Sequence, residues 1–267
     1  MKSIPCILFW LCVTVAVGYS AWLARSYHLR ALGIDLIQQG KLDRLESIVR
    51  GSPGLATQLL GYTYQANRKD LFEMLLAHGA NVNRAQLQTQ WGPYPLLHHF
   101  AREENIYWLK SSFNHGGDAN ARSRFGITPL SEALDSRRAA NAMMAIEWGA
   151  DIHGEIQGQP FYDLAVEALL FEPAYRMLEM GVDPDGTLNQ FPNAVHILKN
   201  CCTGVGLAEE TIRDARENVW FQKILTWYRE RDIDIENARY EPGGENQPGK
   251  WRIPSFSEQK LEIKTRP

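Results

Sequence analysis

The stretch that decides the fold is GITPLSEALDSRRAANAMMAIEWGADIH, residues 126–153. Thr128 can cap the first free amides of a helix, Pro129 suits the first helical position, and Leu130 begins an apolar stripe. A second helix leads to Gly149, where glycine can take the left-handed conformation at little steric cost. The stretch therefore predicts a helix–turn–helix unit that ends in a glycine turn.

The ending of this unit occurs four times along the chain. Its marker glycines are Gly79, Gly116, Gly149 and Gly181, at spacings of 37, 33 and 32 residues. An Asp or Asn follows each glycine two residues later, and these residue types suit the turn that leaves a helix pair. A period near 33 residues indicates a stack of two-helix units that bury their apolar faces against one another.

These motifs resemble the ankyrin repeat family, with its G-x-T-P-L-H-x-A signature and its L-L-x-x-G-A-D-V-N ending. The match is strong at residues 126–153 and 71–83, looser at 92–98 and 158–165, and covers about three quarters of the chain. The resemblance implies an all-α fold, an ankyrin-repeat solenoid whose helix–turn–helix units have β-turn or hairpin connections. It would span residues 30–235 in about five to six units, degenerate end repeats included.

Two positions depart from the signature. Pro160 stands where the family has threonine, which weakens the local helix cap, and Asp163 stands where it has histidine. His98 fills the histidine position of its own unit, where the resemblance implies a structural hydrogen-bonding role between repeats.

The ends of the array follow the pattern less closely. Residues 31–50 resemble a first repeat, and 194–198 with 211–228 resemble a last helix pair. We expect residues 199–210 to form an inserted loop. Residues 240–267 begin with a Pro- and Gly-rich stretch that cannot continue a helix, so we expect a C-terminal tail, flexible or draped on the last repeat.

The most distinct change of composition is at the N-terminus. Residues 4–24 form an uncharged run of 21 residues, IPCILFWLCVTVAVGYSAWLA. A helix needs about 20 residues to cross the hydrocarbon core, which favours an uncleaved signal anchor or transmembrane helix within residues 1–25. A signal peptide cleaved near Ala16-Val17-Gly18 is a second interpretation, and a buried helix of a soluble protein is a third.

The orientation of this segment follows from its flanks. Lys2 precedes the run and Arg25 and Arg30 follow it, so the count of positive charges nearly ties. A short head before an apolar core is typical of a signal anchor with an exported body. We therefore expect a membrane-anchored body outside the cytoplasm, in the periplasm if the source is bacterial, or a soluble periplasmic body if the segment is cleaved.

Little in the sequence indicates chemistry. The net charge of −3 argues against a nucleic-acid partner. The seven histidines share no ligand spacing, the adjacent Cys201 and Cys202 cannot form a disulfide framework, and no phosphate-binding or nucleophile motif is present. We expect no catalytic, cofactor-binding or metal-binding residues, no cofactor and no small-molecule substrate. An enzyme whose site is assembled from distant residues stays open as an alternative.

In ankyrin stacks the turn tips and first helices hold protein partners, which implies a protein-binding role for the tips here. Aromatic and arginine side chains dominate interface energies, and the alternative is that each ring packs back on its own hairpin. The long interval around Gln86–Gln90 could add a binding loop. The candidate protein-binding residues are Trp91, Tyr94, Arg122, Arg124, Phe125, Gln157 and Gln159.

Anchor and repeats together predict a non-enzymatic scaffold that binds a protein partner at a membrane, held there through residues 4–24. A sharper hypothesis is an immunity protein that inhibits a secreted toxic effector. The alternatives are an envelope assembly factor or chaperone, and the enzyme already mentioned.

Overall fold

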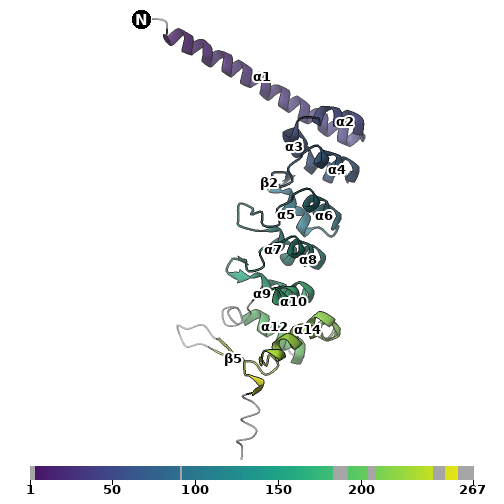
Figure 1. The fold of residues 1–267 in the computed structure, drawn as a ribbon, viewed down its shortest axis with the longest axis vertical. Coiled ribbons are helices and arrows are strands. Elements are labelled where there is room, and N and C mark those ends of the chain that lie inside the picture. Colours follow the sequence, from purple (N-terminus) through teal and green to yellow (C-terminus); the bar gives the residue numbers. More distant parts are fainter. Residues whose placement is uncertain (1–3, 91, 183–191, 204–207, 243–249, 258–267) are drawn as a thin grey trace, which may run out of the picture. The chain divides into compact units, whose positions relative to one another are not determined.

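The computed structural model describes residues 4–90, 92–182, 192–203, 208–242 and 250–257. Side chains are described from residue 18 onward, apart from short gaps beside the undescribed segments. This part of the chain is mostly helical, with thirteen helices and three small antiparallel hairpins (Figure 1).

The helices are α1 (Ile4–Gln39), α2 (Leu42–Val49), α3 (Pro53–Gln65), α4 (Lys69–Ala77), α5 (Leu96–Arg102), α6 (Tyr107–Asn114), α7 (Pro129–Asp135), α8 (Ala139–Glu147), α9 (Phe161–Glu167), α10 (Phe171–Glu179), α12 (Pro192–Thr203), α13 (Glu209–Glu217) and α14 (Val219–Glu230). The strands are β1 (Gln86–Thr89), β2 (Gly92–Pro95), β3 (Glu155–Ile156), β4 (Gln159–Pro160), β5 (Arg239–Glu241) and β6 (Lys250–Arg252). Each odd-numbered strand pairs with the strand that follows it.

The chain divides into two compact units. The first contains residues 1–99 and 107–118, and the second contains residues 100–106 and 119–267.

In the first unit, the end of α1 packs against α2 and α3, and α3 packs against α4. Leu36 and Ile37 of α1 are buried, as are Leu59 and Leu60 of α3. At Gly33 the two helices come so close that a Cβ atom would lie 2.6 Å from Leu59 Cδ1. The glycine therefore sets how closely α1 approaches α3.

The helix α1 joins two parts that the sequence suggested were separate. It continues without a break from the apolar run into the first helix of residues 31–50. None of the helices, judged over the described residues, is both long and apolar enough to cross a membrane. The side chains of residues 4–17, which supply most of the apolar run, lie outside that description.

The marker glycines have the backbone that the sequence predicted. Gly79, Gly116, Gly149 and Gly181 have φ values of 81°, 84°, 82° and 94°. An L-residue would be strained there, because this left-handed region places its Cβ against the following carbonyl. The predicted glycine turn is confirmed at all four positions.

An asparagine links successive turns in the first unit. The Asn83 amide nitrogen donates to the Gly116 carbonyl at 2.9 Å, and its side-chain oxygen accepts from the Asp118 backbone N–H at 2.8 Å. One side chain thus satisfies a carbonyl and an N–H of the next turn along the chain.

The same arrangement occurs in the second unit, at the equivalent asparagine. Asn120 donates to the Gly149 carbonyl at 2.9 Å and accepts from the Asp151 N–H at 2.6 Å. The repetition of both bonds at marker-glycine spacing shows that the two turns are built alike. We call these bonds the asparagine bridges.

The helix starts differ as the sequence indicated. Thr128 caps α7, since its hydroxyl accepts from the Ser131 N–H at 3.2 Å while the Ser131 hydroxyl accepts from the Thr128 N–H at 2.9 Å. Pro160 precedes α9 without a side-chain cap. Both predictions, the capped start of α7 and the weaker start of α9, are confirmed.

The expected loop at residues 199–210 is wrong for residues 199–203 and 209–210, which belong to helices, and residues 204–207 lie outside the described residues. The helix α12 continues to Thr203, and the helix expected over residues 211–228 is broken at Asn218 into α13 and α14. The Asn218 side chain accepts from the N–H groups of Trp220 and Phe221, so it starts a new helix. Asparagine in this role is a strong N-cap, which the apolar pattern alone does not reveal.

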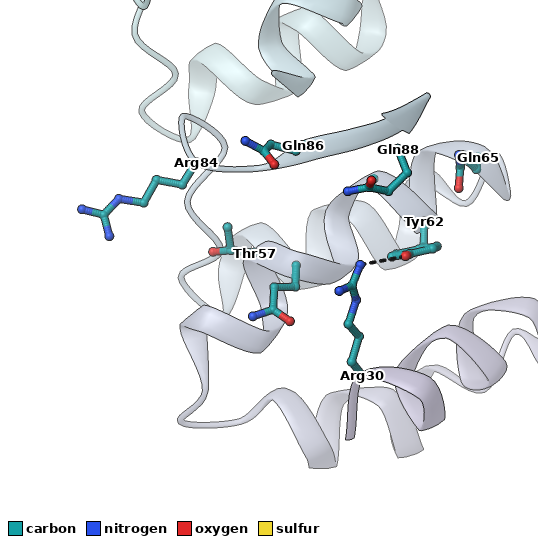
Figure 2. A pocket seen from close by; sticks show the side chains of 9 residues that line it. Arg30, Thr57, Tyr62, Gln65, Arg84, Gln86 and Gln88 are labelled. Carbon is teal, nitrogen blue, oxygen red and sulfur yellow. Dashed lines mark hydrogen bonds between the residues drawn. The ribbon is translucent and has the colours of Figure 1, made fainter. Parts of the chain in front are cut away.

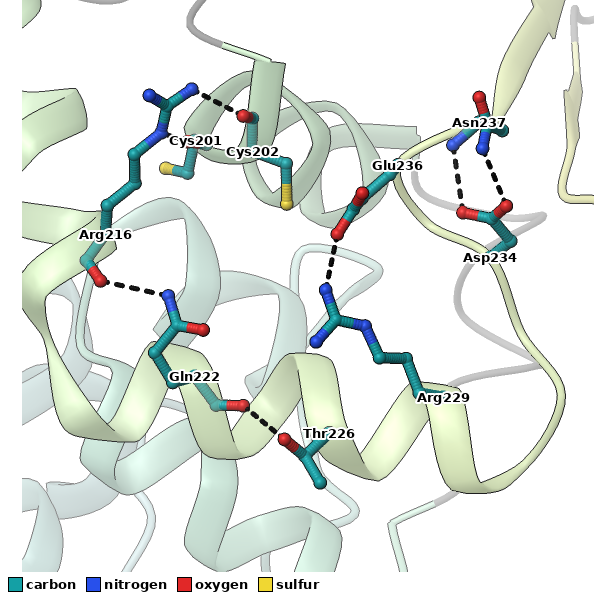
Figure 3. A network of polar contacts seen from close by, with 9 residues as sticks. All are labelled: Cys201, Cys202, Arg216, Gln222, Thr226, Arg229, Asp234, Glu236 and Asn237. Atoms are coloured by element: carbon teal, nitrogen blue, oxygen red, sulfur yellow. Dashed lines mark hydrogen bonds and ion pairs between the residues drawn. The ribbon is translucent and has the colours of Figure 1, made fainter. Parts of the chain in front are cut away.

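Polar contacts link the end of α12 to α13, and link α14 to the segment that follows it (Figure 3). The Arg216 guanidinium donates to the carbonyls of Cys201 and Cys202 at the end of α12. Arg229 pairs with Glu236 at 2.6 Å. The end of α12 is therefore capped by an arginine from the neighbouring helix.

The described part of residues 240–267 includes β5 and β6, which form a hairpin. Trp251 of β6 is 8% exposed and contacts Tyr240 and His196 with its ring. Lys199 of α12 donates to the Ala238 carbonyl. Residues 243–249 and 258–267, on which the predicted flexible tail also falls, lie outside the described residues.

Candidate protein-binding surfaces

The tip between Gly116 and α7 presents three of the candidate residues in the second unit. Arg122 and Arg124 are exposed, and Phe125 is 68% exposed. The Arg124 guanidinium lies 4.6 Å from the centre of the Phe125 ring. Ser123 fixes the loop, because its hydroxyl accepts from the N–H groups of Phe125 and Ile127. The tip thus holds an exposed ring and two cations on an ordered turn.

The other candidates are placed differently. Tyr94 is half-buried and packs edge-on against His98 at 6.3 Å, so its ring packs back on its own unit. Gln157 is exposed at the turn between β3 and β4, and the Gln159 amide donates to Glu167 at 2.6 Å. Trp91 lies outside the described residues.

A polar pocket that the candidate residues do not include opens in the first unit (Figure 2). It has a volume of about 150 Å³ and lies between α1, α3 and β1. Its lining contains two arginines, four glutamines, a tyrosine and no carboxylate. The lining residues are Arg30, Thr57, Gln58, Gly61, Tyr62, Gln65, Arg84, Gln86 and Gln88.

Two periodicities bring these side chains together. Gln58, Tyr62 and Gln65 are four and three residues apart and share one face of α3, while Gln86 and Gln88 alternate on one face of β1. The strand can approach the helix because Gly61 has no side chain; a Cβ atom there would lie 2.7 Å from the Gln86 carbonyl oxygen.

Arg30 is the cation of the pocket. It rises from α1 and donates to the Tyr62 hydroxyl at 2.9 Å, whereas Arg84 extends away from the other side chains in Figure 2. Among the described residues Arg30 forms no ion pair. Its positive charge therefore faces the pocket without a counter-charge.

A second surface lies between α10 and α14 in the second unit. The Lys223 ammonium lies 4.0 Å from the Trp220 ring centre and 5.3 Å from that of Tyr175. Arg231 lies 3.7 Å from the Trp227 ring centre. Tyr175, Trp220 and Trp227 are half-buried, whereas Phe125 is 68% exposed, so Phe125 offers a partner the more accessible ring.

Two buried carboxyls have raised pKa values, as catalytic acids and bases often do. Burial, followed by repulsion from Asp135, raises the pKa of Glu132 to about 7. Burial, followed by repulsion from Glu167, raises the pKa of Asp163 to about 8, and neither Asp163 carboxyl oxygen has a hydrogen-bond partner among the described residues. Burial is the largest cause in both cases, so the raised pKa values do not by themselves indicate a catalytic site.

The cysteines and histidines show no reactive arrangement in the described part of the chain. Burial raises the pKa of Cys201 to about 11 and that of Cys202 to about 12, so both thiols are protonated at neutral pH. No group of three or more His, Cys, Asp or Glu side chains there could hold a metal ion.

The sequence drew attention to Gln86–Gln90 but missed the rest of the pocket. Its parts come from three segments, and no local motif connects Arg30 to β1. The spacing of Gln58, Tyr62 and Gln65 on one helix face was the available signal.

Comparison with known proteins gives no family. No protein-family model matches the chain, and a search of curated proteins finds no similar sequence.

Proposed function

We propose that the chain is an ankyrin-type repeat scaffold that binds a protein partner and is held at a membrane by α1. The observation that carries the repeat part is the pair of asparagine bridges. Each follows a left-handed marker glycine by four residues and joins its turn to the next one. A repeated bond of this kind favours stacked equivalent units, and stacked repeats commonly serve as binding surfaces.

The turn that carries Phe125 supports the binding of a protein partner. An ordered turn that exposes Phe125 just after Arg122 and Arg124 is unusual for a surface selected only for solubility, because exposing an apolar ring to water is unfavourable. Aromatic and arginine side chains are the residues that most often anchor interfaces. This composition supports a protein as the partner.

Support for membrane attachment comes from α1. Tyr19, Trp22 and Tyr27 are 63%, 63% and 65% exposed on this helix, and rings of this kind gather at membrane interfaces. Gly33 lies nine positions after Ala24 in the same continuous helix, a rise of about 14 Å. The proposed anchor would therefore hold the first unit close to the bilayer without a flexible linker.

Affinity purification of the tagged, detergent-solubilised full chain from its native source tests this proposal. We expect one protein in a fixed ratio to the scaffold. Purification of the chain alone would contradict the scaffold function. A reporter fused after Pro267 tests the topology, and activity only in the cytoplasm would contradict an exported body.

A sharper form of the proposal is an immunity protein that holds a toxic effector inactive at the membrane. It is motivated by the combination of a proposed anchor with a binding scaffold. Co-purification of a toxin that loses activity when bound would support it. A partner that instead needs the scaffold for its own folding would favour the assembly factor or chaperone.

A further inference from the structure

We infer that the pocket between α1, α3 and β1 binds an acidic side chain within an extended segment of the protein partner. This inference rests on the proposed scaffold function and names the chemistry of its partner. It stands on the four glutamines of the pocket in Figure 2 and on Arg30, which forms no ion pair within the described part of the chain.

The charge of the pocket selects a carboxylate. Arg30 has no ion pair among the described residues, and the Tyr62 hydroxyl that accepts from it keeps its own proton to donate. An incoming carboxylate can thus accept from the guanidinium and from the hydroxyl at once. Charge-assisted hydrogen bonds of this kind are roughly twice as strong as neutral ones. Because no carboxylate lines the pocket, no anion of its lining competes for the guanidinium.

The glutamines suit a peptide backbone. Each glutamine amide offers a donor and an acceptor, which is the complement of a peptide group. Gln58 and Gln65 of α3 and Gln86 and Gln88 of β1 are exposed, and no hydrogen bond of their side chains is found among the described residues. Two of them lie on α3 and two on β1, so they can bind the backbone of the partner segment before and after its acidic residue.

The backbone of β1 adds further groups. Gln86 pairs with Pro95 and Gln88 with Pro93, and prolines have no N–H to donate. These are therefore the non-hydrogen-bonded pairs of the hairpin, and the N–H and C=O groups of both glutamines point away from β2. The edge of β1 that faces away from β2 therefore carries these backbone groups. It lies beside α3, because the Gln86 carbonyl comes close to Gly61. An extended segment can lie along it, as in strand addition to an exposed sheet edge.

The size of the pocket limits what enters it. A volume of about 150 Å³ accommodates a single side chain and not a folded element. One acidic residue enters, and the neighbouring residues of the partner stay at the rim.

The test uses two synthetic peptides, Ac-Ala-Ala-Glu-Ala-Ala-amide and its glutamine counterpart, titrated into the detergent-solubilised full chain. Side-chain N–H resonances of Arg30 and of the pocket glutamines report binding by NMR. The Glu peptide should shift them with an affinity about tenfold higher than the Gln peptide, the ratio expected for one charge-assisted contact. Arg30→Gln should abolish the difference, with folding checked by circular dichroism.

A matched variant serves as the control. Arg25→Gln removes an exposed arginine of α1 that does not line the pocket. It should keep the preference for the Glu peptide. Equal shifts by the two peptides, no shift by either, or an unchanged preference in Arg30→Gln would each overturn the inference. Inorganic phosphate that shifts the resonances as strongly as the Glu peptide would also overturn it, in favour of a general anion site.

Failure of this inference and failure of the scaffold function can be told apart. If a partner co-purifies equally well with Arg30→Gln and with the unaltered chain, the pocket inference fails and the scaffold function stands. If no partner co-purifies but the Glu peptide binds selectively, the scaffold function fails and the pocket chemistry stands.

Discussion

Substitution of Asn120 by alanine removes one asparagine bridge and should lower the stability of the second unit. The change deletes two hydrogen bonds, the 2.9 Å bond to the Gly149 carbonyl and the 2.6 Å bond from the Asp151 N–H. A typical bond contributes about 0.5–1.5 kcal/mol net, and both freed groups remain accessible to water. We therefore expect a loss of about 1–2 kcal/mol in the free energy of unfolding.

Urea unfolding followed by tryptophan fluorescence measures this loss. With a slope of about 2 kcal/mol per M, the midpoint should fall by about 0.5–1 M. Hydrogen exchange gives a local readout that a general loss of stability does not mimic. The Asp151 amide should exchange faster in the variant, whereas the Ala150 amide, bonded to Ala145 at 2.9 Å, should keep its protection under native conditions.

Two further variants complete the experiment. Asn83→Ala breaks the equivalent bridge in the first unit and should cost a similar amount. His153 occupies the same repeat position, and its side chain has no hydrogen bond among the described residues, so His153→Ala should change stability by less than about 0.5 kcal/mol. Equal effects at Asn120 and His153, or unchanged exchange at Asp151, would refute the bridging role.

Four other substitutions, at Asp163, Gly61, Tyr162 and Tyr228, test the packing. Asp163→Asn should flatten the pH dependence of stability. In the folded state the pKa of Asp163 is raised from 3.8 to about 8, so its contribution to the free energy of unfolding is complete below pH 4 and falls by about 1.4 kcal/mol per pH unit as the pH rises toward 8. Urea unfolding at pH 5, 6 and 7 measures this slope. A variant with the same slope as the unaltered chain would contradict this. Gly61→Ala places a Cβ atom 2.7 Å from the β1 carbonyl and should cost about 1–3 kcal/mol in thermal unfolding, whereas Gly54→Ala, in the same helix with open space around it, should cost nothing. Tyr162→Phe and Tyr228→Phe each remove the 2.9 Å hydrogen bond between the two buried hydroxyls and should each cost about 1–3 kcal/mol. The double variant should cost less than the sum, which a double-mutant cycle measures.

The repeat turns were predictable because their chemistry is local. A left-handed glycine, and a threonine followed by a proline, each dictate a backbone within a few residues. The observed φ values at the marker glycines and the cap at Thr128 follow directly from these residue types.

Features that depend on several segments were not predictable in this way. Residues 25–32 contain no glycine or proline, so no residue ends α1 between the apolar run and the first repeat. The continuity of this helix could have been predicted from the sequence, but we expected two separate parts. The break at Asn218 depends on its side chain, which accepts from the Trp220 N–H and so starts α14. The apolar pattern continues across this position and therefore does not indicate the break. The pocket needs α1, α3 and β1 together, and only the three-dimensional arrangement supplies that.

The most direct test of the central claim is site-specific photo-crosslinking in the native source. A photoreactive residue is placed at Phe125 on the tip, at Gln88 in the pocket, or at the exposed Arg213 of α13 as a control. We predict that Phe125 and Gln88 crosslink to one and the same protein, and that Arg213 does not. Crosslinks from Arg213 alone, or no discrete protein product from any position, would contradict a scaffold that binds its partner through these surfaces.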